Sequence, residues 1–302
     1  MRMRLPRTLR ILAISVASLA ALGLVYQPIA TAIDAHRFPA PGRLIDMGGY
    51  HLHIDCEGLG GPTIVLEAGV GGSSLDWSLV RSDLAKETRV CVYDRAGYGW
   101  SEPGPMPRTS ARAAEELHTL LIRAGEPGPY LLAAQGMGGL HAQVFAAKYP
   151  RETAGLVLID PPSGTTAPPA AGPMSVAYDR AARVDQVVAW LARLSVHRVP
   201  AVAAALPAAP GDIAEKLPEE FRLAYRAVTS TSRHFDTLAA ETAALPESQR
   251  QAGAAVLPPD LPLYLLLPDS APSGLTHLDH PKAVLDAIRT VRDRARRGAR
   301  SH

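Results

Sequence analysis

The chain has 302 residues and a mass of 32.0 kDa, with 47% hydrophobic and 20% charged residues. These values are typical of a globular protein with a substantial core, and they exclude a disordered or collagen-like chain. The formal net charge is +2; Arg2, Arg4, Arg7 and Arg10 supply four positive charges, which leaves −2 for the rest. Charge therefore gives no reason to expect nucleic acid as a partner. Two cysteines and no metal-type Cys/His spacing give no reason to expect a metal or another cofactor.

An uncharged segment follows the four arginines and runs from Ile11 to Ile33. Its most apolar part, Ile11–Val25, has the length of a signal-peptide core, and the whole segment reaches the roughly 20 residues that span a bilayer. Positive charge before an apolar run keeps the N-terminus in the cytoplasm. We therefore expect residues 1–34 to be a signal anchor or a signal peptide, with residues 35–302 on the extracytoplasmic side.

The choice between an anchor and a cleaved signal depends on the end of this segment. Ala30-Thr31-Ala32, preceded by Pro28, fits a cleavage site, and cleavage after Ala32 would release an exported protein. We favour the anchor, because Tyr26–Ile33 prolongs the uncharged stretch. A buried core helix is disfavoured, because such a helix would carry a polar face.

After a proline-containing linker, strand patterns alternate with helical patterns. Gly48-Gly49 separates the first two strands and predicts a hairpin. The predicted strands are Arg43–Met47, Tyr50–Cys56, Thr63–Glu67, Arg89–Asp94, Tyr130–Gln135 and Gly155–Asp160. The predicted helices among them are Ser74–Glu87, Thr109–Ala124 and Leu140–Lys148. Continuously apolar strands that alternate with helices predict an α/β protein with a mainly parallel sheet covered on both faces.

Residues 161–261 change character and become rich in alanine and proline. Helical patterns at Met174–Leu194, Asp212–Ser230 and Arg233–Leu245, without a convincing strand between them, predict a helical cap inserted into the α/β domain. Leu263–Leu267 then returns to a strand pattern. His280–Arg297 closes the chain as a helix.

The turn Ala134-Gln135-Gly136-Met137-Gly138-Gly139 lies between a predicted strand and a predicted helix. It resembles the nucleophile elbow of the α/β-hydrolase fold, in which the serine of G-x-S-x-G occupies a sharp turn flanked by small residues. Other segments resemble the same superfamily in the same order: Leu66–Ser74 with Trp77, Tyr93–Ser101, Gly155–Asp160 and Leu278–Pro281. The chain is thus identified as a member of the α/β-hydrolase fold from about Arg43 to Val291. The resemblance implies an oxyanion hole formed by the backbone N–H groups of Val70 and Met137.

The nucleophile of this family is missing, because Gly136 occupies the position of the serine. Glycine cannot form an acyl-enzyme. It also tolerates the backbone conformation of the elbow better than other residues do, so the exchange is expected to preserve the fold. No other serine lies in a G-x-S-x-G context.

The region of the catalytic histidine is shortened as well. Between the strand Leu263–Leu267 and the last helix there is too little chain for the crossover helix, eighth strand and histidine loop of the family. His277 and His280 are nearby, and we expect them to be surface or capping residues; His277 is at most a displaced base. Asp269 and Asp160 follow the seventh and sixth strands, where the family places its acid, and we expect both to cap loops.

These features predict a catalytically impaired protein of the ester and amide hydrolase lineage. Loss of serine or histidine alone costs about 10⁶ in turnover in serine hydrolases, and loss of both costs little more. Three alternatives stay open. The first is an active hydrolase that acts on a small apolar ester or amide through a non-standard nucleophile or an activated water. The second is a non-enzymatic protein that binds a small apolar ligand under its cap, and the third is a decayed relative without activity.

Three residue pairs outside the elbow carry further expectations. Cys56 and Cys91 fall on strands that are neighbours in the sheet order of this fold, so a disulfide is expected in an exported protein, with two buried thiols as the alternative. His51 and His53 alternate with apolar residues on a strand and are expected to face solvent. Asp94 and Arg95 are expected to brace the turn after the fourth strand.

Overall fold

The sheet begins with the predicted hairpin. The computed structural model describes residues 6–162, 173–199, 210–267 and 275–299. Strands β1 (Arg43–Asp46) and β2 (His51–Glu57) pair in antiparallel fashion. Both glycines of the turn have positive φ angles, +91° at Gly48 and +116° at Gly49, which only glycine adopts readily. This geometry explains why two glycines follow one another here.

The remaining strands form a parallel array. They are β3 (Thr63–Glu67), β4 (Val90–Tyr93), β5 (Tyr130–Gln135), β6 (Thr153–Ile159) and β7 (Leu263–Leu266). The order across the seven-stranded sheet is β1-β2-β4-β3-β5-β6-β7; the pairs β1–β2 and β2–β4 are antiparallel, and all other neighbouring pairs are parallel. Every residue of β3, β4 and β5 is buried, which is why their sequences are apolar without alternation. The prediction of a mainly parallel sheet is confirmed.

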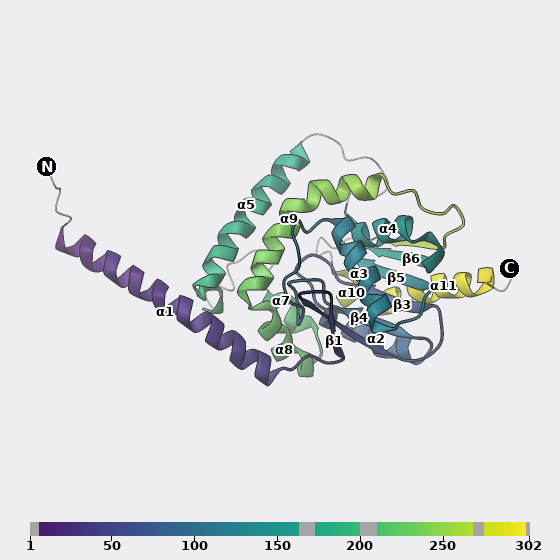
Figure 1. Cartoon of the computed structure of the whole chain (residues 1–302), viewed down its shortest axis with the longest axis horizontal. Helices are drawn as coiled ribbons and strands as arrows, with labels where there is room; N and C mark the ends of the chain where they lie inside the picture. The colour runs from purple at the N-terminus through teal and green to yellow at the C-terminus, as the bar shows by residue number, and fades with distance from the viewer. Residues whose placement is uncertain (1–5, 163–172, 200–209, 268–274, 300–302) are drawn as a thin grey trace.

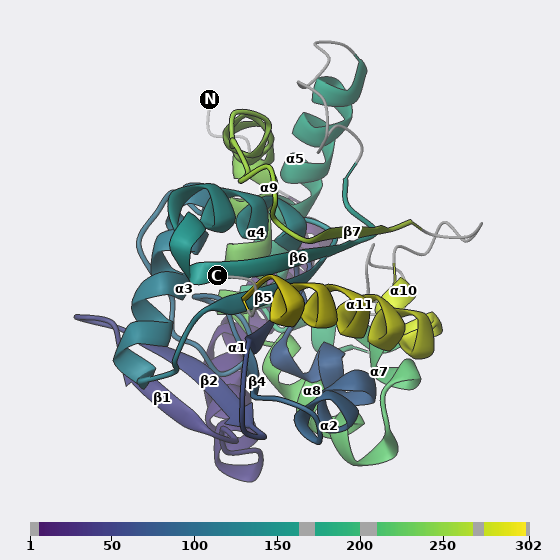
Figure 2. The same ribbon diagram turned by 90° about the vertical axis from the view of Figure 1, so that its right-hand side faces the viewer.

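Helices cover both faces of this sheet (Figure 2). Helices α3 (Ser110–Ala124) and α4 (Gly138–Lys148) pack on one face through residues such as Leu120 and Phe145. Helices α2 (Ser78–Ala85) and α11 (Pro281–Ala299) pack on the other, through Leu84 and Ile288. Short 3₁₀ turns precede α2 and β6, at Ser74–Trp77 and Pro150–Glu152.

The segment expected to form a cap is helical wherever the structure describes it. Its elements are α5 (Pro173–Arg193), the 3₁₀ turn η3 (Val196–Arg198), α7 (Pro210–Lys216), α8 (Glu219–Thr229) and α9 (Ser232–Gly253). The predicted helix Asp212–Ser230 is instead two helices, because Pro218 stands at the N-terminus of α8. Helix α9 is longer than predicted and continues through Pro246. It lies against α5 and α4 and connects the cap to the domain.

The C-terminal region is as short as the sequence indicates. Strand β7 is followed by residues 268–274, which lie outside the described part of the chain together with Asp269 and its predicted capping role. The short helix α10 (Thr276–Asp279) then leads directly into α11. Within the described residues, β7 is the last strand.

Helix α1 (Arg7–Arg37) contains the apolar N-terminal segment and projects from the body of the protein (Figure 1). By length and composition it could cross a membrane, and its most apolar 18-residue window is not buried, as it would be in a core helix. A signal sequence meets the same criteria. Only the second half of α1 contacts the cap: the Nε2 group of Gln27 donates a hydrogen bond to the carbonyl of Ser230 at 3.0 Å.

Candidate functional site

The elbow between β5 and α4 adopts the sharp turn that the sequence predicts. Gly136 has a φ angle of +53°, and its N–H donates to the carbonyl of Ile159 at 2.8 Å. A Cβ atom added to Gly136 would meet no atom of the described residues within 4 Å, whereas most glycines of the domain core are closely surrounded. The elbow therefore leaves open the space of a nucleophilic side chain, but no side chain occupies it.

The loop after β3 lies directly against this elbow. A Cβ at Gly138 would come within 2.5 Å of the Ala68 carbonyl oxygen, and a Cβ at Gly69 would collide with the side chain of Gln135. The small residues on either side of Gly136 are thus required by close backbone packing. Because these contacts involve the loop residues just before Val70, they bring Val70 to the side of the elbow.

Val70 and Met137 occupy positions suited to the predicted oxyanion hole. Met137 is the N-cap residue of α4, where backbone N–H groups have no acceptor within the helix. Val70 is half exposed and lies in a turn that the Gly72 N–H closes on the Gly69 carbonyl at 3.1 Å. The φ angle of +70° at Gly71 makes this a type II turn with Val70 at its second position. The oxyanion role of these two amides stays a prediction.

His277 is not a surface residue. Its side chain is only 2% exposed, its ring lies 5.2 Å from the ring of Trp77, and burial lowers its pKa to about 4. The expectation of a surface or capping position was wrong, because the short α10 is pressed inward between α11 and the Trp77 turn. The described contacts give His277 a packing role.

Asp160 holds α10 in place. It follows β6 with a φ angle of +47°, and its carboxylate accepts hydrogen bonds from the N–H (2.8 Å) and the hydroxyl (2.6 Å) of Thr276. Both carboxylate oxygens therefore have a structural partner. His280, the other histidine weighed in this region, stands between α10 and α11, and its N–H donates to the Thr276 carbonyl.

A buried ion network links the loop after β3, residues 68–73, to the cap; this segment is called the oxyanion loop after its predicted role. Arg95 pairs with Glu67 at 2.7 Å and with Glu241 of α9 at 2.9 Å, and it also donates to the carbonyls of Ala68 and Gly69. Burial raises the pKa of Glu241, but the Arg95 guanidinium outweighs that effect and holds the pKa below its usual value. Arg95 thus braces more than its own turn, since it also ties the cap to the site.

His53 is the second residue that the sequence misplaced. It is fully buried, and its Nδ1 atom lies 2.8 Å from the Asp94 carboxylate. Burial lowers the pKa of His53, but Asp94 outweighs that effect and raises it. Alternation along β2 suggested a solvent-facing side chain, but the chain after α1 covers this face, and the other ring nitrogen contacts the Pro41 carbonyl. Asp94 also accepts from the backbone of Ser74 and Trp100, in agreement with a bracing role.

Two further histidines lie near the site and were not weighed from the sequence. His234 of α9 faces the oxyanion loop, with Nε2 4.0 Å from the Cβ position of Gly71. His141 of α4 contacts the Ser110 hydroxyl through Nδ1 at 2.8 Å. Burial lowers the pKa of each to about 3, so both rings are neutral near pH 7. No local sequence signal marks His234, because its position depends on how α9 docks.

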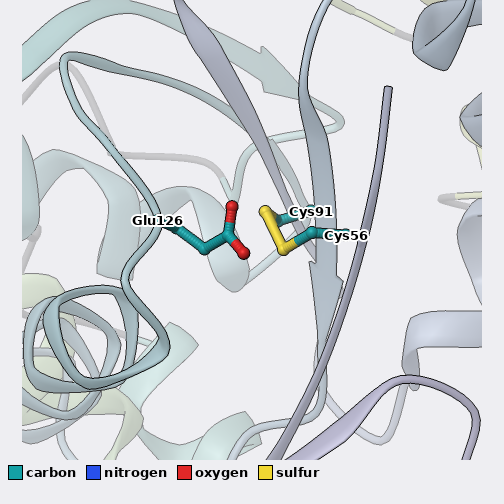
Figure 3. A group of neighbouring side chains, drawn as sticks. All are labelled: Cys56, Cys91 and Glu126. Carbon is teal, nitrogen blue, oxygen red and sulfur yellow. A yellow bond between two sulfur atoms is a disulfide. The ribbon is translucent and has the colours of Figure 1, made fainter. Parts of the chain in front are cut away.

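Cys56 and Cys91 face each other in register on β2 and β4 and are joined by a disulfide, with Cα atoms 4.1 Å apart. Glu126 points toward the sulfur atoms (Figure 3), and the three groups together have a metal-like spacing. Disulfide-bonded cysteines have no thiolate to offer a metal. Glu126 is instead paired with Arg43 and Arg89, at 2.9 Å each.

A cavity of about 500 Å³ opens beside β7, between α10 and the start of α11. Its lining includes the charged residues Asp279, Lys282 and Asp286. Apolar residues such as Leu266 and Pro281 complete the lining, which includes no described residue of the cap, so this cavity is not the pocket expected under the cap.

Comparisons with known proteins identify similar sequences and folds. The sequence profile of the α/β hydrolase fold family matches residues 62–252. The uncharacterised protein YbdG of Bacillus subtilis (strain 168) is 29% identical over 160 residues, which cover 50% of this chain and 49% of YbdG. The chain spans about half or less of the length of the curated relatives it matches.

Two solved structures show the same architecture. An esterase from Thermogutta terrifontis has a TM-score of 0.57 and 22% identity, and the match covers 83% of this chain and 98% of the esterase. The Cif epoxide hydrolase from Acinetobacter nosocomialis has a TM-score of 0.63 and 13% identity, with 89% and 96% covered. At these identities the likeness concerns the fold alone.

Proposed function

This chain belongs to the α/β-hydrolase fold family, and from that premise we propose that it is a membrane-held, catalytically impaired member that binds a small apolar ligand. The ligand carries a carbonyl or carboxylate group that the amides of Val70 and Met137 recognise. The cap selects its apolar part.

The observation that carries this proposal is the bare elbow. Gly136 keeps the positive φ angle and the open space of a nucleophile position, but it offers no atom that can attack a carbonyl carbon. What survives in such a site is the oxyanion hole, which alone gives roughly 10³–10⁴ over the uncatalysed reaction. That acceleration is too small for useful hydrolysis, whereas two convergent N–H groups suffice to orient a ligand oxygen.

The neighbouring acid–base candidates support the same proposal. His277 is packed against Trp77, and both oxygens of Asp160 bind Thr276. A triad needs a histidine that is free to accept the serine proton and a carboxylate that orients it. Thr276 occupies the Asp160 carboxylate, and the described residues give the buried His277 ring a packing contact but no carboxylate that orients it.

Retention of α1 as an anchor is supported by its contacts. Ala30, the first residue of the A-x-A match, is 7% exposed within a continuous helix, and Gln27 is enclosed by the cap. In the folded chain the cap packs on the helix that carries this match, so a retained α1 is part of the structure. We therefore favour a retained α1 with the α/β domain on the extracytoplasmic side.

The experiment tests catalysis and binding separately on the full chain in detergent. We expect no labelling by a fluorophosphonate probe and no turnover of p-nitrophenyl butyrate above that of the buffer. We expect hexanoate to raise the Tm, whereas hexanol, which lacks the carboxylate, raises it less.

A matched pair of variants tests the oxyanion amide. Val70→Pro removes the N–H at a turn position that proline favours, and Val70→Ala keeps it. The hexanoate shift should disappear only in Val70→Pro. Ester turnover at ordinary enzymatic rates would instead support an active hydrolase that uses an activated water, and equal hexanoate shifts in both variants would refute the binding site.

A further inference from the structure

The cap carries an apolar surface next to α1 that the rest of the described chain leaves uncovered. On α5, Val184, Val187 and Trp190 are 40%, 60% and 65% exposed, and their spacing of three residues puts them along one side of the helix. The opposite side of α5 is buried against α9 through Val188, Ala189 and Ala192. Helix α5 thus has two apolar sides, of which only one has a partner among the residues that the structure describes.

The position of α5 relative to α1 indicates what covers the second side. The C-terminal end of α5 meets α1 at Gly23, where a Cβ would collide with the Leu194 carbonyl, and the Ser195 hydroxyl lies 3.1 Å from the Gly23 carbonyl oxygen. From this contact α5 runs across the direction of α1 and not along it (Figure 1). A membrane crossed by α1 would therefore have α5 lying near its plane.

The length of α1 decides how deep this contact lies. From Arg10, the last arginine before the uncharged stretch, to Gly23 there are 13 residues, or about 20 Å of helix at 1.5 Å per residue. The hydrocarbon core of a bilayer is about 30 Å thick. If the hydrocarbon core of the bilayer begins at Arg10, it ends near Ala30. Gly23 and the adjoining end of α5 then lie about 10 Å below the outer boundary of that hydrocarbon core, within the outer leaflet.

Gln27, the polar residue of α1 at this depth, has protein partners, as the low polarity of a bilayer favours. The Gln27 amide is 3% exposed; its oxygen accepts from Arg198 at 3.1 Å, and its nitrogen donates to the Ser230 carbonyl. The Arg198–Asp34 ion pair, at 2.9 Å, lies one turn beyond Ala30, where headgroups and water begin. On the other side of α1, Tyr26 and Ile29 are more than half exposed.

We infer that the cap is seated in the outer leaflet of the bilayer that α1 crosses, with the α5 side formed by Val184, Val187 and Trp190 facing the lipid. This inference rests on the proposed retention of α1 as an anchor. The exposed Arg183 of the same helix can extend toward headgroups while its stem lies against lipid.

The test uses tryptophan fluorescence of the full chain in phosphatidylcholine/phosphatidylglycerol vesicles that contain lipids brominated on the acyl chain. Trp77 is fully buried and Trp100 lies in the α/β domain, so only Trp190 should be quenched. We expect a loss of roughly one third of the emission, which is the share of Trp190 if the three tryptophans emit equally. We expect no loss of emission in Trp190→Phe.

A second pair of variants provides a matched control. Val187→Glu and Val256→Glu both place a charge at an exposed valine, but Val256 follows α9, away from α5. Val187→Glu should at least halve the quenching, and Val256→Glu should leave it unchanged. Absence of quenching in a chain that resists alkaline extraction would overturn the seated cap and leave the anchor intact. A chain released by alkaline extraction, or one that begins after Ala32, would instead overturn the anchor.

Discussion

Replacing Gly136 by serine restores the missing hydroxyl and separates the consequences for fold and chemistry. The matched variant is Gly136→Ala, which introduces the same Cβ without the hydroxyl. Since nothing lies within 4 Å of that Cβ, neither variant is expected to clash with its surroundings. The two variants differ only in the group that could act as a nucleophile.

The stability effect follows from the backbone. A non-glycine residue at a φ angle of +53° costs roughly 1–2 kcal/mol, while the loss of glycine freedom in the unfolded chain returns about 0.4–1 kcal/mol. We expect both variants to lower the free energy of unfolding by about 1 kcal/mol, which corresponds to roughly 2–4 °C in Tm for a domain of this size. Urea and thermal unfolding measure it. Unchanged or higher stability in Gly136→Ala would contradict the left-handed conformation of the elbow.

The catalytic effect follows from the missing base. A serine without a histidine turns over substrate about 10⁶ times more slowly than a complete triad. We therefore expect Gly136→Ser to hydrolyse p-nitrophenyl butyrate less than tenfold faster than Gly136→Ala. Turnover of about 1 s⁻¹ or more would refute the reasoning, because it would require a base within reach of residue 136. Adding His234→Gln or His277→Gln to Gly136→Ser would then identify that base.

Three further predictions concern stability. Alkylation of the native protein should add no mass without reductant and two alkyl groups after reduction; two thiols that react without reductant would disprove the disulfide. The double variant Cys56→Ser/Cys91→Ser should lower the free energy of unfolding by about 3–4 kcal/mol, the value for a closed loop of 35 residues. Glu241→Gln should lower the free energy of unfolding by about 3 kcal/mol, because it breaks a buried ion pair. Asp236→Asn, which breaks an exposed pair, should lower it by less than about 1 kcal/mol. Equal losses of stability in urea unfolding would speak against the buried network. Burial lowers the pKa of His277 to about 4, so between pH 6.5 and 4 the unfolded chain binds more protons than the folded chain does. The contribution of His277 to the free energy of unfolding therefore falls as the pH falls through that window. The stability difference between the wild type and His277→Gln should shrink there by up to about 3 kcal/mol and should stay constant above pH 7.

The fold could be predicted because it rests on local patterns that the tertiary structure does not override. Gly48-Gly49 permits only a tight hairpin, and the apolar run of β3 fits only a strand that is buried on both faces. The elbow was recognisable for the same reason, since the close backbone packing at such a turn requires small residues at fixed positions in any chain that forms it. Helix ends in the cap were less accurate: Pro218 begins a helix there, whereas Pro246 lies within one.

The surroundings of the elbow could not be predicted, because they depend on segments that are distant in sequence. His53 is buried by the chain near Pro41, and His277 by Trp77, 200 residues earlier. The position of His234 over Gly71 and the pairing of Arg95 with Glu241 both depend on the docking of α9. Period-two alternation reports which side of a strand a residue occupies, but it does not report what covers that side.

The geometry of the elbow also bears on whether the chain is a decayed enzyme. Closing the space beside Gly136 would bury apolar surface at about 25 cal/mol per Å², so an unused hollow tends to be filled by neighbouring side chains. Here Gly69 and Gly138 still press the oxyanion loop against the elbow, and the Arg95 network still holds α9 at the loop, while the space at Gly136 stays open. An elbow and an ion network that are both kept without a nucleophile fit the proposed ligand-binding role better than a decayed enzyme, in which neither would be maintained. Cooperative unfolding of the free chain, with a Tm that rises on addition of hexanoate, would distinguish the two.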